Sequence, residues 1–135
     1  MDENKRKHLE FIQNVITRMS TNSFLIKGWT VALVSALFAL AAKDSDPRYV
    51  LVSYFAIPVF WLLDGFYLSQ ERQYRKLYDA ARAAAATDFS MDASSFAVGR
   101  DAWLAAVFST TLHLLYVPMI VIALIVMFVL QSHGK

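Results

Sequence analysis

The chain has 135 residues, of which 57% are hydrophobic and 18% charged, and its net charge is +2. This length allows one domain, and the composition excludes a disordered tail, a collagen-like fibre and a basic nucleic-acid-binding arm. The absence of cysteine excludes disulfide bonds and thiolate metal sites. Because the apolar residues fall into three long runs, the sequence indicates an all-α membrane protein.

Segment 1–22 is polar and has apolar residues at intervals of three and four, which predicts an amphipathic helix. Residues 20–23, where this segment meets the first apolar stretch, are all of types that favour helix N-caps. We therefore expect this helix to end near Met19 and a second helix to begin near Ser23. Its apolar face either packs on another helix of the protein or lies on the membrane surface.

Three apolar stretches are long enough to cross a bilayer as helices. The first two lie within segment 23–69 and are joined by a short outer turn at 43–48. The third lies within 102–131 and is longer than a membrane requires, so we expect it to tilt, kink or begin as an interfacial segment. Segment 70–101 between them is expected to be a helical extension of the second span followed by a loop.

The second span has no stop signal at its inner end, since residues 69–86 contain neither Gly nor Pro. We expect one helix from about Tyr49 to Ala86 that projects from the membrane and packs with segment 1–22 in a small helical bundle within an oligomer. Lys and Arg concentrate in 1–27 and 70–101. The positive-inside rule then places the N-terminus and the long connection in the cytoplasm and the C-terminus outside.

Lys27 and Asp64 are the lone charges of the first and second spans. Charge inside a membrane is costly, and antiparallel spans would place the two residues at similar depth. The leading hypothesis is an intramembrane ion pair that fixes the register of two helices. The alternatives are that Lys27 reaches the headgroups alone, or that the two charges belong to an ion path.

Small residues recur along one face of the first span, the pattern that lets membrane helices approach closely. The helix-packing candidates are Gly28, Ala32 and Ala36, with Gly65 in the second span.

Polar residues recur at helical spacing at the start of the third span. In an oligomer this stripe would line a pore, with Ser109, His113 and Tyr116 as the candidate lining residues. The alternative is ordinary hydrogen bonding between helices.

Four basic residues lie on the projecting part of the second helix: Arg72, Arg75, Lys76 and Arg82. They are candidate contacts for an anionic ligand such as an oligonucleotide, and equally suit lipid headgroups or pairing with Glu71 and Asp79. No Gly-rich phosphate loop or metal-ligand spacing is present. We therefore expect no catalytic residue, cofactor or metal.

Several motifs resemble a family of small bacterial membrane proteins. They are RMSTNSFLIKGW at 18–29, WLLDGFYL at 61–68, ERQYRKLY at 71–78, FSMD at 89–92 and FSTTL at 108–112. Such proteins are similar to the membrane effectors encoded beside nucleotidyltransferases in bacterial anti-phage systems, of which Hailong is one.

The resemblance implies an oligomeric channel or pore that depolarises the bacterial inner membrane in anti-phage defence. It also implies control by a nucleotide or short oligonucleotide made by a partner nucleotidyltransferase. The alternative functions are a non-conducting membrane adaptor that anchors a soluble partner, and a holin-like toxin that perturbs the membrane.

Overall fold

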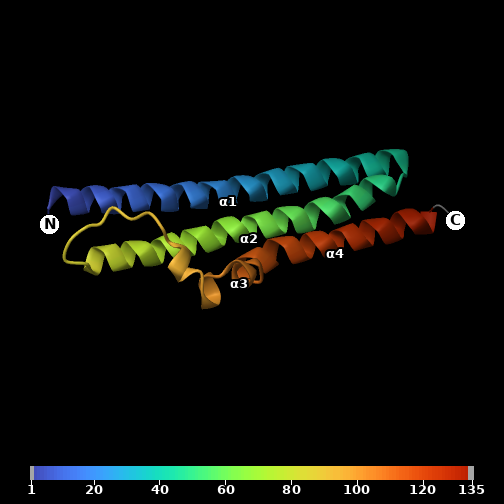
Figure 1. Ribbon diagram of the computed structural model, residues 1–135. Coiled ribbons are helices and arrows are strands. Elements are labelled where there is room, and N and C mark those ends of the chain that lie inside the picture. Colours follow the sequence, from blue (N-terminus) through green and yellow to red (C-terminus); the bar gives the residue numbers. More distant parts are fainter. Residues whose placement is uncertain (1, 134–135) are drawn as a thin grey trace.

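The computed structural model describes residues 2–133, and this part of the chain is all-helical. The long helices are α1 (Glu3–Asp44), α2 (Arg48–Ala83) and α4 (Thr110–His133), and α3 (Trp103–Val107) is a single short turn. Two 3₁₀ turns, η1 (Ser94–Phe96) and η2 (Gly99–Asp101), precede α3. Figure 1 shows α1 and α2 as an antiparallel hairpin, with α4 beside α2 over only part of the length of α2.

The three long helices are each long and apolar enough to cross a membrane, which confirms the predicted all-α fold and supports the predicted membrane class. The hairpin is much longer than a bilayer is thick, because the 42 residues of α1 span about 63 Å against a hydrocarbon core of about 30 Å. We call residues 23–69 and 110–133 the membrane half. The projecting half comprises residues 3–22 and 70–101.

The predicted break between Met19 and Ser23 is wrong, because α1 continues through it without interruption. Residues of cap type end a helix only where the backbone leaves the helical conformation. Here the helix packs along α2 on both sides of the serines, and the Ser23 hydroxyl is used in a contact with α2. The real N-cap is Asp2, whose carboxylate accepts the backbone N–H of Lys5 at 2.6 Å.

The turn between α1 and α2 lies at 45–47, inside the predicted segment 43–48. Ser45 adopts the left-handed conformation that closes many helix C-termini, with φ 51°. Asp46 then accepts hydrogen bonds from the Arg48 backbone and guanidinium. These bonds hold the pKa of Asp46 below its ordinary value. The far end of the hairpin is thus a tight turn closed by local contacts.

The predicted continuous second helix is confirmed, although it begins at Arg48 and ends at Ala83, three residues before Ala86. Ala84 is already extended. Pro58 lies inside the helix without ending it. Residues 84–102, which we call the strap, then run back along α2 toward the membrane half (Figure 1).

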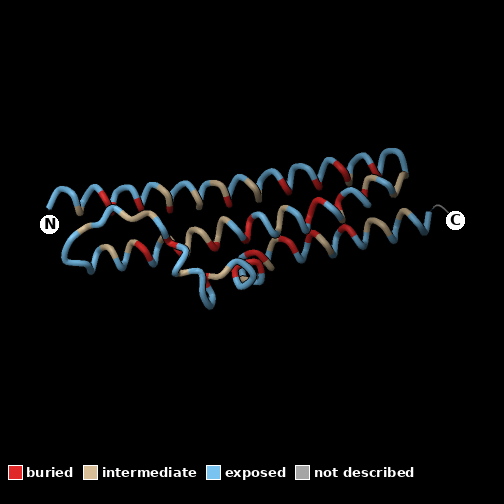
Figure 2. The backbone as a smooth tube through the Cα atoms, viewed as in Figure 1, coloured by how far each residue is buried: buried red, intermediate tan, exposed pale blue. Residues whose placement is uncertain are grey.

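The third apolar stretch is interrupted rather than continuous. α3 ends at Val107 with Phe108 as its C-cap, and α4 begins at Thr110 with the Ser109 hydroxyl accepting the backbone N–H of Leu112 at 3.4 Å. The chain accommodates the length of this stretch by a sharp break between α3 and α4, which corresponds to the expected kink. Figure 2 shows the coil of α3 almost end-on, whereas the long helices run across the picture.

Two buried clusters occupy the two halves (Figure 2). The membrane-half cluster includes Val34, Ile57 and Leu112, from all three long helices. The projecting-half cluster joins Ile12 and Ile16 of α1 to Leu77 of α2, and is covered by Ala93, Met91 and Phe96 of the strap. The apolar face of segment 1–22 therefore packs on the protein itself, and the strap packs onto the same cluster.

A buried charge cluster that joins the three long helices as the candidate functional site

Asp64 is fully buried in α2 and accepts side-chain hydrogen bonds from both neighbouring helices. Tyr116 of α4 donates its hydroxyl to Oδ2 at 2.9 Å, and Ser23 of α1 donates to Oδ1. The Lys27 ammonium lies 2.6 Å from Oδ2. One carboxylate thus bonds to groups on α1 and α4, and a carboxylate in an apolar interior is stable only with such partners.

Lys27 lies one helical turn beyond Ser23 on α1. Its ammonium also donates a hydrogen bond to Ser23 Oγ at 2.8 Å. Its side chain is 25% exposed, whereas that of Asp64 is 0% exposed. The structure therefore brings Lys27 and Asp64 together as the sequence predicted. Sequence reasoning missed Ser23, which it treated only as a cap; its spacing of four from Lys27 was the available signal.

Tyr116, a candidate pore-lining residue of an oligomer, faces the interior of the protomer. It is completely buried, and its ring stacks on Trp61 with centroids 5.8 Å apart. His113 packs edge-on against the same Trp61 at 5.7 Å, and Ser109 caps α4. Within the protomer, Tyr116 thus makes the hydrogen bond between helices that was the alternative to pore lining, while Ser109 and His113 make other contacts.

The cluster lies near one end of the membrane half. Asp64 is 16 residues after Arg48, which is about 24 Å along the helix, and Lys27 is 17 residues before Asp44, about 25 Å. Counted from the turn between α1 and α2, a hydrocarbon core of about 30 Å would end about 5 Å beyond both residues, toward the projecting half. The charge pair therefore lies in the membrane half, close to its junction with the projecting half.

The strap is held by side chains that donate to its backbone carbonyls, at successive levels along α2. Ser69 donates to Asp101 O at 2.6 Å and Tyr74 to Met91 O at 3.0 Å, and Trp61 holds the following helix α3 by donating to Val107 O at 2.7 Å. Irregular backbone in a packed environment needs such partners. The strap therefore couples the position of α4 to the projecting part of α2.

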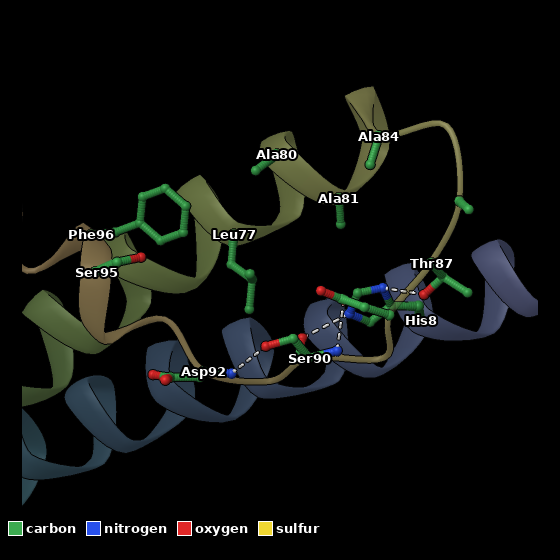
Figure 3. Close-up of a pocket in the computed structure, with 12 residues that line it drawn as sticks. His8, Leu77, Ala80, Ala81, Ala84, Thr87, Ser90, Asp92, Ser95 and Phe96 are labelled. Atoms are coloured by element: carbon green, nitrogen blue, oxygen red, sulfur yellow. Dashed lines mark hydrogen bonds between the residues drawn. The ribbon is translucent and has the colours of Figure 1, made fainter.

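His8 fixes the other end of the strap. Its buried ring has Nε2 2.8 Å from the Ser90 carbonyl and Nδ1 2.6 Å from the Thr87 hydroxyl (Figure 3). In a neutral ring, Nε2–H donates to the carbonyl while Nδ1 accepts the hydroxyl proton. The contact ties the first helix to the strap across 79 residues of sequence.

A cavity of about 520 Å³ opens beside His8, between α2 and the strap (Figure 3). Leu77, Ala81 and Phe96 provide apolar walls, and Asp88 and Asp92 lie among its polar lining. Lys and Arg are absent from the described lining residues. The charge of this cavity does not suit an oligonucleotide.

The four candidate anion-binding residues are not a free basic patch. Arg75 pairs with Glu71 at 2.7 Å, and Arg82 lies 3.9 Å from Asp79. Arg72 donates to the Arg100 carbonyl at 2.7 Å. The fourth, Lys76, is exposed. The pairing with acidic neighbours that the sequence allowed is therefore present for two of the four.

The predicted helix-packing residues separate into two groups. Gly65 is buried against Val107 of α3. Gly28, Ala32 and Ala36 instead lie on the exposed side of α1, so their expected role in close packing is not realised within the protomer. The buried face of α1 in the membrane half carries other residues: Ser23, Thr30, Val34, Leu37 and Ala41.

Within residues 2–133, no group of three His, Asp or Glu side chains is placed to hold a metal ion. Comparison of the chain with protein-family models, with curated proteins and with solved structures finds no match.

Proposed function

We propose that the protein is the subunit of a homo-oligomeric ion channel in the bacterial inner membrane, with its projecting half in the cytoplasm. The observation that carries the proposal is the bonding of Asp64 to Lys27 on α1 and Tyr116 on α4. Ionisable residues inside a membrane are costly and mark functional sites. This one stands where the projecting half meets the membrane half.

Assembly is part of the proposal because the three long helices of one copy pack directly on one another. Leu112 and Tyr116 of α4 and Ile57 of α2 fill the space between them and are 0% exposed. A water-filled path therefore requires several copies. His113 and Ser109, which are partly exposed, remain candidates to face that path, whereas Tyr116 would have to leave Asp64 first.

Gating follows from the same connections. The strap is fixed to α2 and His8 and leads directly into α3 and α4. A change in the projecting half would thus bias α4 between two packings, with the Tyr116–Asp64 bond made in one and broken in the other. The proposal includes control by a nucleotide or short oligonucleotide from a partner nucleotidyltransferase, in an anti-phage effector. The motif resemblance described above supports this part.

The test is ion flux from liposomes that contain the purified protein, with and without short oligonucleotides. We expect flux from discrete oligomers and a changed response in Tyr116→Phe, which removes only the hydroxyl donated to Asp64. Tyr54→Phe is the matched control, since its hydroxyl contacts the Ala123 carbonyl away from the cluster, at 3.3 Å. Absence of flux from intact oligomers under every condition would contradict the channel.

A non-conducting adaptor is the second candidate, and the length of the projecting half favours it. The part of α2 beyond Ser69 extends 14 residues, about 21 Å, and presents an exposed surface that a soluble partner could use. An adaptor predicts no flux together with a cellular effect that requires its partner.

A further inference from the structure

Residues 103–109, which we call the elbow, turn across the direction of the long helices (Figure 1). Ala106 and Val107 form its inner side and are buried. Its outer side is apolar: Trp103 is 49% exposed, Leu104 66% and Phe108 63%. Three large apolar side chains are therefore about half or more exposed at one place.

Hydrogen bonds to α2 fix the depth of the elbow. Trp103 Nε1 donates to the Leu62 carbonyl at 2.9 Å, and Trp61 Nε1 donates to the Val107 carbonyl at 2.7 Å. Leu62 is 14 residues after Arg48, about 21 Å along α2, and Phe66 is about 27 Å along it. The elbow thus lies near the end of a core of about 30 Å.

Other aromatic residues lie at the same level. Phe66 packs edge-on against Trp103 at 6.1 Å and against Tyr67 at 5.7 Å. On α1, Trp29 is 69% exposed and lies two residues from Lys27. Trp and Tyr are enriched where hydrocarbon meets headgroups, because an apolar ring with one polar atom suits that boundary.

Basic residues follow on the projecting side. Arg100 has a side chain that is 80% exposed, and its carbonyl accepts the Arg72 guanidinium at 2.7 Å. Arg72 is ten residues beyond Leu62, about 15 Å farther along α2. Aromatic groups at the core boundary with guanidinium groups beyond them match the order of acyl chains and phosphates in a leaflet.

We infer that the elbow lies in the bilayer interface on the projecting side, with its apolar side chains among the lipid chains and Arg100 among phosphate headgroups. The occupant of this surface is lipid because the surface continues the exposed apolar side of α4, represented by Leu114 and Val121. The elbow is thus an in-plane anchor that holds the strap at the membrane. This inference does not depend on whether the protein conducts ions.

The test uses the absence of cysteine in the chain, which makes single-cysteine labelling unambiguous. A nitroxide at Leu104→Cys is measured in vesicles of zwitterionic and anionic phospholipids for collisions with oxygen and with a water-soluble nickel complex. Phe89→Cys in the strap and Val121→Cys in α4 are matched controls, because those side chains are 43% and 47% exposed.

We expect the label at 104 to meet oxygen several-fold more often than at 89, and nickel several-fold less often, at a shallower depth than 121. Nickel access equal to that at 89 would place the elbow in water and overturn the inference. Poor access to both reagents would mean that protein covers the elbow, such as a second copy, and would also overturn it. Phe108→Cys repeats the measurement if Leu104→Cys does not fold.

Discussion

Gly65 of α2 packs directly against the backbone and side chain of Val107 of α3. A Cβ placed on Gly65 would overlap the Val107 side chain and lie 3.0 Å from its Cα. By contrast, nothing lies within 4 Å of a Cβ placed on Gly28. Packing therefore requires glycine at position 65 but not at position 28.

Gly65→Ala is expected to lower the free energy of unfolding by about 1–3 kcal/mol, the usual cost of overpacking a rigid contact. Gly28→Ala is the matched control and should leave it unchanged or raise it by about 0.5–1 kcal/mol, since alanine favours the helix. Thermal unfolding in detergent measures both. Equal losses in the two variants would mean that the Gly65–Val107 contact does not limit the residue at 65.

Removing one member of the Lys27–Asp64 pair should destabilise the protein unequally. Lys27→Met leaves a fully buried carboxylate without its cation and is expected to cost about 3–5 kcal/mol. Asp64→Leu should cost less, because the Lys27 side chain is 25% exposed and can extend toward the headgroups. Urea or thermal unfolding gives the order of the two losses.

The double variant Lys27→Met with Asp64→Leu tests whether the two groups act as a pair. We expect it to be more stable than Lys27→Met alone, since an apolar pair leaves no unpartnered charge. Lys76→Met, on the exposed side of α2, is the control for loss of a lysine. If the losses of the single variants simply add, the residues are energetically independent.

His8→Ala should loosen the strap without unfolding the hairpin. The change removes contacts to the Ser90 carbonyl and the Thr87 hydroxyl. We expect backbone amides of residues 87–93 to exchange with solvent at least tenfold faster, since each lost bond is worth about 1 kcal/mol. Asn14→Ala, at an exposed position of the same helix, is the control. Unchanged exchange would show that other contacts alone hold the strap.

Ala32→Leu with Ala36→Leu tests the exposed small face of α1. Both positions are exposed, so the thermal stability of the protomer should change little. The proposed oligomer should weaken if small residues allow two copies to approach. Crosslinking and mass measurement in detergent report the stoichiometry. An unchanged oligomer would place the contact between copies elsewhere.

Hydropathy was sufficient to predict the membrane-spanning helices, and the placement of Gly, Pro and Asp was sufficient to predict the turn near Asp46 and the long second helix. These features depend on runs of residues with one chemical character, which a single sequence displays directly. The contact between Lys27 and Asp64 was predictable for a related reason. Charges inside apolar runs are rare, and antiparallel geometry leaves them few partners.

Features that depend on tertiary contacts were not predictable. Ser23 has the side chain of a cap, but α1 continues through it because the helix packs along α2 on both sides and the Ser23 hydroxyl contacts Asp64. Tyr116 sits on a polar stripe, but whether that stripe faces water or α2 depends on the rotation of α4 about its axis. The break at Ser109 also follows from packing, since Gly65 admits α3 at that place.

The uninterrupted course of α1 and α2 through both halves has a mechanical consequence. From Asp64 to Ala83 the helix extends 19 residues, a lever arm of about 28 Å. With the charge cluster as a fulcrum, a tilt of about 10° at that level displaces the free end by about 5 Å. Since neither helix is interrupted between the charge cluster and the tip, a force applied at the tip is transmitted to the level of Asp64 instead of being absorbed by a flexible joint.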